Sequence, residues 1–257
     1  MDIVLILVLF AIGFIGSFLS GMLGVGGSII KYPMLLYIPP LFGLVAFTAH
    51  EVSGISAVQV LVASLAGVWA YRKGGYLNKE LILYMGIAIL AGSLLGSFGS
   101  DLMSEAGVNI VYGTLAVIAA IMMFLPKGVE REGSLITFNR PLAAGLALLV
   151  GIASGIVGAA GGFLLVPLMI TVLKIPTRMT IATSLAITFI SSVGASVGKI
   201  ATGQVEYGSA AIMIVASILA APLGAKLGKR LPARVLQLLL AVLITATAIK
   251  IWTDILF

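Results

Sequence analysis

The chain has 257 residues, of which 61% are hydrophobic and only 9% are charged. About a quarter of the residues in soluble domains are charged, so this composition excludes a soluble protein. It predicts a multi-pass protein of the cell (inner) membrane, with the lipid bilayer around it. The net charge of +6 comes from basic residues at the ends of apolar runs, which is typical of membrane loops and argues against nucleic acid as a partner.

The first half of the chain is predicted to contain a broken helix followed by three full membrane spans. An apolar run over 3–23 leads into a glycine-rich stretch, and a short run over 28–38 then ends at two prolines. At about 1.5 Å per residue, the short run covers roughly half of a 30 Å hydrocarbon core, so we expect a half-helix or one arm of a re-entrant hairpin. The three spans are predicted over 44–71, 81–98 and 108–125.

The second half repeats this order after a charged connection. A segment from residue 142 reaches a second glycine-rich stretch, and a half-helix is predicted over 163–173. Three spans follow, over 177–200, 207–225 and 235–255. One membrane domain is therefore expected to consist of a first repeat (1–126), a cytoplasmic linker (127–140) and a second repeat (141–257).

The two glycine-rich stretches have the same spacing. SGMLGVGGSIIKYP, Ser20–Pro33, aligns without a gap with SGIVGAAGGFLLVP, Ser154–Pro167. Each glycine costs about 1 kcal/mol relative to alanine inside a helix, so a regular helix is not expected through either stretch. Because the pattern occurs in both halves, we expect backbone groups to be exposed at both glycine-rich stretches.

The placement of the basic residues predicts how the halves lie in the membrane, because cytoplasmic loops collect Lys and Arg. If each broken segment returns to the side from which it came, twelve of the fifteen basic residues lie on one face; if it crosses once, they divide equally. The first arrangement is favoured, and it inserts the halves as inverted repeats with both termini outside. The twelve residues are Arg72, Lys73, Lys79, Lys127, Arg131, Arg140, Lys174, Arg178, Lys226, Lys229, Arg230 and Arg234.

Inverted repeats that each carry a broken helix are the usual construction of secondary transporters, whose sites lie near the membrane midplane. The first N–H groups of a helix lack internal acceptors and lie at the positive end of its dipole, so both breaks can bind an anion. Alternatively, the glycines only permit close helix crossing. The candidate binding residues from the two stretches are Gly24, Gly26, Gly27, Ser28, Gly158, Gly161 and Gly162.

Several polar residues outside the glycines are further candidates. Placing the charge of Lys31 inside a membrane half-helix costs free energy. Its side chain is therefore expected to face a cavity or a partner, or else to snorkel to the outer surface. His50 and Glu51 open the long helix of the first half and are candidates for holding a coupling proton, unless both simply lie at the outer interface. Ser56 aligns with Ser184, and these hydroxyls either line a path or bond to helix backbone.

Patterns of soluble enzymes are not satisfied. The run over 194–198 has the spacing of a nucleophile elbow, but no strand precedes it and the sole histidine is in the other half. The run over 193–200 resembles a phosphate loop without its first glycine. We therefore expect no enzyme, no cofactor and no metal site.

The duplicated small-residue pattern, together with Ala182-Thr183-Ser184-Leu185, resembles the sulfite exporter TauE/SafE family of membrane anion transporters. The likeness covers essentially the whole chain. It implies sulfite, sulfonates and related organosulfur anions as substrates and adds Thr183 and Ser184 to the candidate binding residues. The first copy departs from the pattern, because Ser28 replaces a glycine and Lys31 stands where the second copy has Leu165.

Taken together, these features predict an all-α polytopic membrane protein with two inverted repeats, each a glycine-broken re-entrant helix hairpin followed by three transmembrane helices. The expected function is a secondary transporter or exporter of small anions, working by alternating access around a midplane site between the glycine-rich breaks. An anion channel and a non-transporting membrane scaffold subunit are the alternatives. Either a proton or sodium can serve as coupling ion, and the sequence leaves the oligomeric state open.

Overall fold

The computed structural model describes residues 2–26, 28–72, 74–125, 138–159 and 161–256. In these ranges the chain is all-helical, and eight of its helices are long and apolar enough to cross a membrane. Two shorter helices, α2 (Ser28–Leu41) and α7 (Gly162–Thr171), each follow a glycine-rich stretch. The eight candidate spans are α1 (Ile3–Leu23), α3 (Ala49–Tyr71), α4 (Lys79–Gly99), α5 (Glu105–Phe124), α6 (Arg140–Val157), α8 (Thr177–Ala201), α9 (Tyr207–Gly228) and α10 (Ala233–Leu256).

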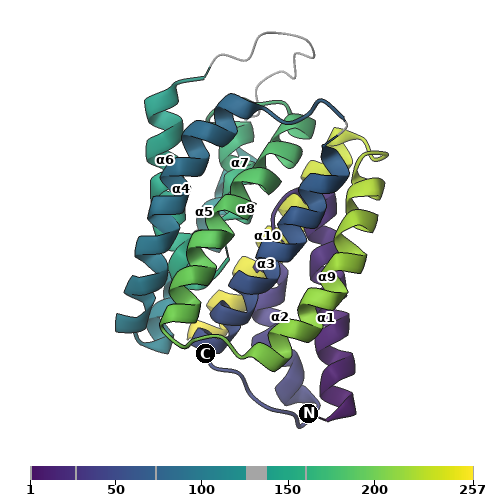
Figure 1. Cartoon of the computed structure of the whole chain (residues 1–257), viewed down its shortest axis with the longest axis vertical. Coiled ribbons are helices and arrows are strands. Elements are labelled where there is room, and N and C mark those ends of the chain that lie inside the picture. Colours follow the sequence, from purple (N-terminus) through teal and green to yellow (C-terminus); the bar gives the residue numbers. More distant parts are fainter. Residues whose placement is uncertain (1, 27, 73, 126–137, 160, 257) are drawn as a thin grey trace.

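The helices form one bundle around a central pair. Helices α3 and α8 lie in the middle and pack against each other, and they are the most buried of the candidate spans (Figure 1). On one flank α1 packs against α9, on the other α4 packs against α6, and α5 packs against α10. Each of these pairs joins a helix of the first half to a helix of the second, so the two halves share one core.

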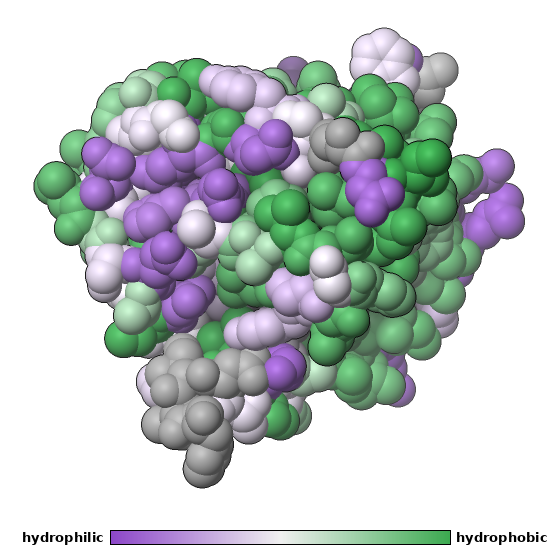
Figure 2. Space-filling model, turned by 90° about the horizontal axis from the view of Figure 1, so that it is seen from below, coloured by the Kyte–Doolittle hydropathy of each residue, from purple (hydrophilic) through white to green (hydrophobic). Residues whose placement is uncertain are grey.

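The two ends of the bundle carry different charges. Both termini lie at the lower end in Figure 1, where Glu105 Oε2 accepts the amide N–H of Ala49 and Asp101 lies beside Gln204. Hydrophilic residues gather over part of this end when it is seen from below (Figure 2). We call it the acidic end, because it carries the carboxylates Glu51, Asp101, Glu105 and Glu206. The opposite end, the basic end, carries Arg72, Lys79, Arg140, Lys174, Arg178, Lys226, Lys229, Arg230 and Arg234.

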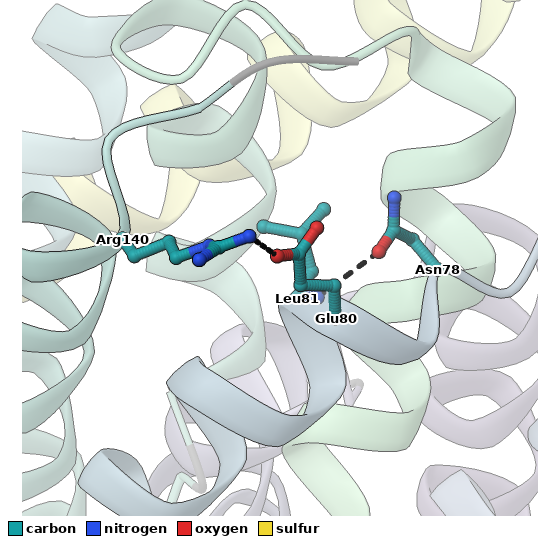
Figure 3. A network of polar contacts seen from close by, with 4 residues as sticks. All are labelled: Asn78, Glu80, Leu81 and Arg140. Carbon is teal, nitrogen blue, oxygen red and sulfur yellow. Dashed lines mark hydrogen bonds and ion pairs between the residues drawn. The ribbon is translucent and has the colours of Figure 1, made fainter. Parts of the chain in front are cut away.

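An ion pair at the basic end joins the first turns of α4 and α6. Arg140 Nη2 lies 2.5 Å from Glu80 Oε1, and the two side chains point toward each other from neighbouring helices (Figure 3). Beside it, the side chain of Asn78 caps α4 by accepting the N–H of Leu81 at 3.0 Å. Because both charged side chains are exposed, the pair contributes at most about 1 kcal/mol to stability. The packing of α4 against α6 therefore holds these helices together more than the ion pair does.

Helix boundaries differ from the sequence prediction by up to five residues, and two of these differences have a clear local cause. Helix α3 begins at Ala49 and not at residue 44, because Thr48 and Glu51 form a capping box in which each side chain bonds the backbone of the other residue. Helix α2 continues three residues beyond its predicted end. Pro39 and Pro40 fall in its last turn, and their carbonyls accept the N–H groups of the two residues 42 and 43, so the turn closes without a proline donor.

Glycine interrupts the helix at both predicted places. Helix α1 ends at Gly24 with φ 77°, and α6 ends at Gly158 with φ 71°, a left-handed conformation that glycine adopts without a steric penalty. At Gly158 the packing also requires glycine, because a Cβ there would lie 1.9 Å from the carbonyl oxygen of Ser53 in α3. The chain turns within a few residues at each place and starts the next helix at Ser28 or Gly162.

Candidate functional site

The turn between α1 and α2, which we call the first tip, meets the turn between α6 and α7, the second tip. A Cβ placed on Gly162 would lie 2.5 Å from the carbonyl oxygen of Val25, and one placed on Gly26 would lie 3.8 Å from that of Ala159. Thr188 of α8 reaches both tips, with Oγ1 at 2.9 Å from the first of these Cβ positions and Cγ2 at 3.0 Å from the second. The two glycine-rich turns, far apart in sequence, therefore meet beside the middle of α8.

The central helices hold both tips in place. Ser184 Oγ of α8 donates to the carbonyl oxygen of Gly24 at 2.9 Å, and Gly24 also packs against the backbone of Ile181. On the other side, Gly158 packs against the backbone of Ser53 in α3. Each tip is thus supported by a central helix that belongs to the opposite half of the chain.

Lys31 is fully buried beside the first tip. Its Nζ donates to the carbonyl oxygen of Gly26 at 3.3 Å and to Oε1 of Gln59. Gln59 Nε2 donates in turn to Ser17 Oγ at 2.8 Å and to Ser217 Oγ at 2.7 Å. The ammonium therefore points into a buried polar network between α1, α2, α3 and α9, and it does not snorkel to the surface.

The charge of Lys31 is not balanced by a carboxylate. Among the residues that the structure describes, Lys31 forms no ion pair, and its oxygen partners are a neutral carbonyl and a neutral amide. Placing an unpaired ammonium at membrane depth costs several kcal/mol, which such residues usually recover through a functional partner. An anion at the first tip would supply that partner.

On α1 and the two central helices, some buried hydroxyl groups have no partner among the described residues. Ser20, Ser56, Thr188 and Ser191 are each fully or almost fully buried, and their hydroxyls make no hydrogen bond within the described part of the chain. Each buried polar group left unpaired costs about 1–3 kcal/mol. Four such hydroxyls in the two central helices and α1 therefore indicate that this region can bind a polar ligand or water.

The start of α7 offers two further donors. The N–H groups of Leu164 and Leu165 both donate to the carbonyl oxygen of Gly161, at 3.0 and 2.8 Å. The amides of Gly162 and Phe163, in contrast, donate to no backbone oxygen of a described residue. They lie at the positive end of the helix dipole and beside the first tip, where they can bind an oxyanion.

The other predicted binding residues have different surroundings. Gly27 lies outside the described residues, and Ser28 begins α2. Thr183 Oγ1 accepts the N–H of Asn78 at 3.1 Å and donates to the carbonyl oxygen of Tyr76 at 3.3 Å. Thr183 thus ties the connection between α3 and α4 to α8, whereas its neighbour Ser184 is the residue that contacts a tip.

His50 and Glu51 lie at the acidic end and face different partners. Glu51 caps α3 through Thr48. His50 Nδ1 lies 3.3 Å from Oε1 of Gln204, and Nε2 lies 3.2 Å from the carbonyl oxygen of Met103. Neutral imidazole has a single N–H donor, so both of these oxygens receive a hydrogen bond only when the ring is protonated. No hydrogen bond joins either side chain to a described residue of a tip.

A second buried lysine was not singled out by the sequence. Lys199 in the last turns of α8 donates from Nζ to Ser100 Oγ at 2.7 Å, Gln204 Oε1 at 2.7 Å and the carbonyl oxygen of Ile156 at 2.9 Å. A lysine two residues from the end of an apolar run is usually an interfacial residue, so the sequence carried no signal for its burial. Its neighbours at the acidic end include Asp101, and in this it differs from Lys31.

Comparison with known proteins agrees with the features described above. A family model described as "Sulfite exporter TauE/SafE" matches residues 9–251. The chain is 25% identical over 218 residues to the "Probable membrane transporter protein YunE" of Bacillus subtilis (strain 168), covering 78% of this chain and 80% of that protein. It is 29% identical over 177 residues to a "Probable membrane transporter protein" of Xylella fastidiosa (strain Temecula1), covering 67% and 65%.

A further relative is the "Probable membrane transporter protein YdhB" of Bacillus subtilis (strain 168), which is 25% identical over 224 residues, covering 84% of this chain and 86% of that protein. No solved structure matches the chain. The family match extends over both glycine-rich breaks and over all or most of every candidate span. The chain therefore belongs to the sulfite exporter TauE/SafE family, and it is a multi-pass membrane transporter and not an enzyme.

Proposed function

We propose that this transporter moves small sulfur oxyanions, such as sulfite and sulfonates, through a site between the two tips. The observation that carries the proposal is Lys31, a fully buried ammonium with no ion pair among the described residues. The amides of Gly162 and Phe163, which donate to no backbone oxygen of a described residue, and the hydroxyl of Thr188 lie around the same tips and add neutral donors. One positive charge with several neutral donors is the arrangement that a small oxyanion requires.

The proposal includes two inverted repeats, each beginning with a re-entrant hairpin. Its support is the repetition of contacts between the halves: α1 packs against α9 as α6 packs against α4. Gly24 meets Ile181 of α8 as Gly158 meets Ser53 of α3. In such transporters one repeat rocks against the other around a fixed midplane site, and alternating access would work here in that way.

The proposed topology places the acidic end outside and predicts a sided labelling pattern. The chain has no cysteine, so single cysteines can be introduced without background. In sealed cells, Ser104→Cys and Thr202→Cys at the acidic end are expected to react with an impermeant thiol reagent. Arg230→Cys at the basic end is expected to react only after permeabilisation, as is Ser134→Cys, whose position lies outside the described residues. Labelling of the last two variants in sealed cells would overturn the orientation.

The substrate class can be tested by thermal stability in detergent. A ligand that binds only the folded protein stabilises it by about 2.7 kcal/mol at a concentration 100 times its Kd. We therefore expect sulfite, thiosulfate or taurine to raise the Tm by several degrees and acetate to leave it nearly unchanged, with sulfate as a further comparison. The absence of a shift with every sulfur anion would contradict the proposed substrate class.

A further inference from the structure

A small pocket at the basic end is lined by two cations and two phenol rings. Its volume is about 10 Å³, enough for a single water molecule. It lies where the end of α3, the start of α8 and the connection between α9 and α10 come together. Its lining consists of Tyr71, Tyr76, Arg178, Ile181, Gly228 and Lys229, with Leu236 behind them.

The two cations of the pocket bind only neutral oxygens. Arg178 donates from Nη1 to the carbonyl oxygen of Lys229 at 2.9 Å and from Nη2 to that of Leu231 at 3.3 Å. Lys229 Nζ donates to the carbonyl oxygen of Ala70 and lies 5.0 Å from the centre of the Tyr71 ring. Neither cation forms an ion pair with a carboxylate among the described residues. Within the described part of the chain, the two positive charges at this small pocket therefore have no negative partner.

Helix capping explains part of this arrangement but not the pocket. Cations near the last carbonyls of a helix interact favourably with its dipole, and both Ala70 and Lys229 lie at helix ends. Capping does not require two cations to converge with the phenols of Tyr71 and Tyr76 on a common cavity. Guanidinium, ammonium and phenol groups together form a typical set of donors for an oxyanion.

The pocket lies directly next to the first tip. Arg178, Ile181 and Ser184 follow one another at three-residue intervals along one face of α8. Ile181 lines the pocket, and its backbone oxygen would lie 2.7 Å from a Cβ placed on Gly24. Ser184 then donates to the carbonyl oxygen of Gly24. One residue, Ile181, thus separates the pocket from the tip at which Lys31 lies.

We propose that Arg178, Lys229 and the hydroxyl of Tyr71 form a second anion site, which receives a small oxyanion from the basic end before it passes to Lys31. This site rests on the proposed function. The oxygens of the anion replace the carbonyl oxygens of Lys229 and Leu231 at the guanidinium, so binding releases the connection between α9 and α10 from α8. In the present structure these carbonyls hold the site closed, which accounts for its small volume.

The test measures sulfite transport separately from each end, in membrane vesicles of both orientations. For Arg178→Gln we expect the KM for sulfite presented at the basic end to rise about tenfold or more, because a charged hydrogen-bonding partner is lost. The KM from the acidic end is expected to stay within about twofold. Arg230→Gln removes the same charge from an exposed position of the same connection, so it is the matched control and should change neither KM by more than about twofold.

A milder variant covers the case in which Arg178→Gln does not fold. Tyr71→Phe keeps the buried ring and removes one donor, and we expect it to raise the KM at the basic end about threefold without changing the KM at the acidic end. An equal rise from both ends, an unchanged KM in both variants, or an equal effect of Arg230→Gln would overturn the second site. Absence of transport by the unaltered protein would overturn the proposed function, and with it this site.

Discussion

Lys31→Met is expected to lower the rate of sulfite transport about 100-fold or more while leaving the protein folded. Removing one partner of a buried, hydrogen-bonded charge pair costs about 3–5 kcal/mol, which corresponds to this loss of affinity for the anion. Methionine has a similar length and no charge, so the substitution removes the cost of burying an unpaired ammonium, and this gain offsets the loss of the hydrogen bonds to Gly26 and Gln59. The measurement is the initial rate of sulfite efflux from proteoliposomes, together with the Tm of the purified variant.

Lys79→Met is the matched control for this experiment. Lys79 is exposed at the basic end, so this substitution removes the same charge from a position outside the proposed path. It is expected to retain most of the transport rate. Full transport by Lys31→Met would contradict the assignment of Lys31 to the anion site. Loss of folded protein would instead identify the network of Lys31, Gln59 and Ser17 as a structural one.

The sequence was sufficient for the membrane character and the positions of most helices. Hydropathy alone placed the spans, because each apolar run ends at charged or turn-forming residues. The glycine-rich stretches predicted both helix breaks, since glycine is the residue that accepts the left-handed conformation found at Gly24 and Gly158. The start of α3 at Ala49 also has a signal in the sequence, which the prediction of a start at residue 44 did not use. Thr48 is followed three positions later by Glu51, and this spacing is typical of a capping box.

The partners of the polar residues were not predictable in the same way. Gln59 bonds Ser17 and Ser217 only because α1, α3 and α9 pack together, and Ser17 and Ser217 are 200 residues apart. Thr188 occupies the contact between the tips, although a threonine in an apolar helix has no distinctive pattern. Local sequence determines where a helix starts and stops, whereas the contents of this site depend on which helix faces cross in the middle of the bundle.

Gly162→Ala is expected to lower transport about 30-fold or more, because it adds a Cβ at the contact between the two tips. The added Cβ would lie 2.5 Å from the backbone carbon and oxygen of Val25 and 2.9 Å from Thr188 Oγ1, so the first tip must shift. Such overpacking typically costs about 1–3 kcal/mol, and we expect the Tm to fall by several degrees. We expect a large loss of transport together with only a modest loss of stability, because a displacement of about 1 Å misplaces donors on both sides of the anion.

Gly145→Ala provides the matched comparison. Gly145 lies exposed in α6, and a Cβ there meets no atom within 4 Å, so the substitution should stabilise the helix by up to about 1 kcal/mol and leave transport unchanged. Rates of sulfite efflux and Tm values measured on both variants separate the two effects. If Gly162→Ala transports like Gly145→Ala, the tips can separate without loss of function, and the anion site must lie elsewhere than between them. If both variants fold and only Gly162→Ala loses transport, glycine is required at this position because the two tips must approach each other closely.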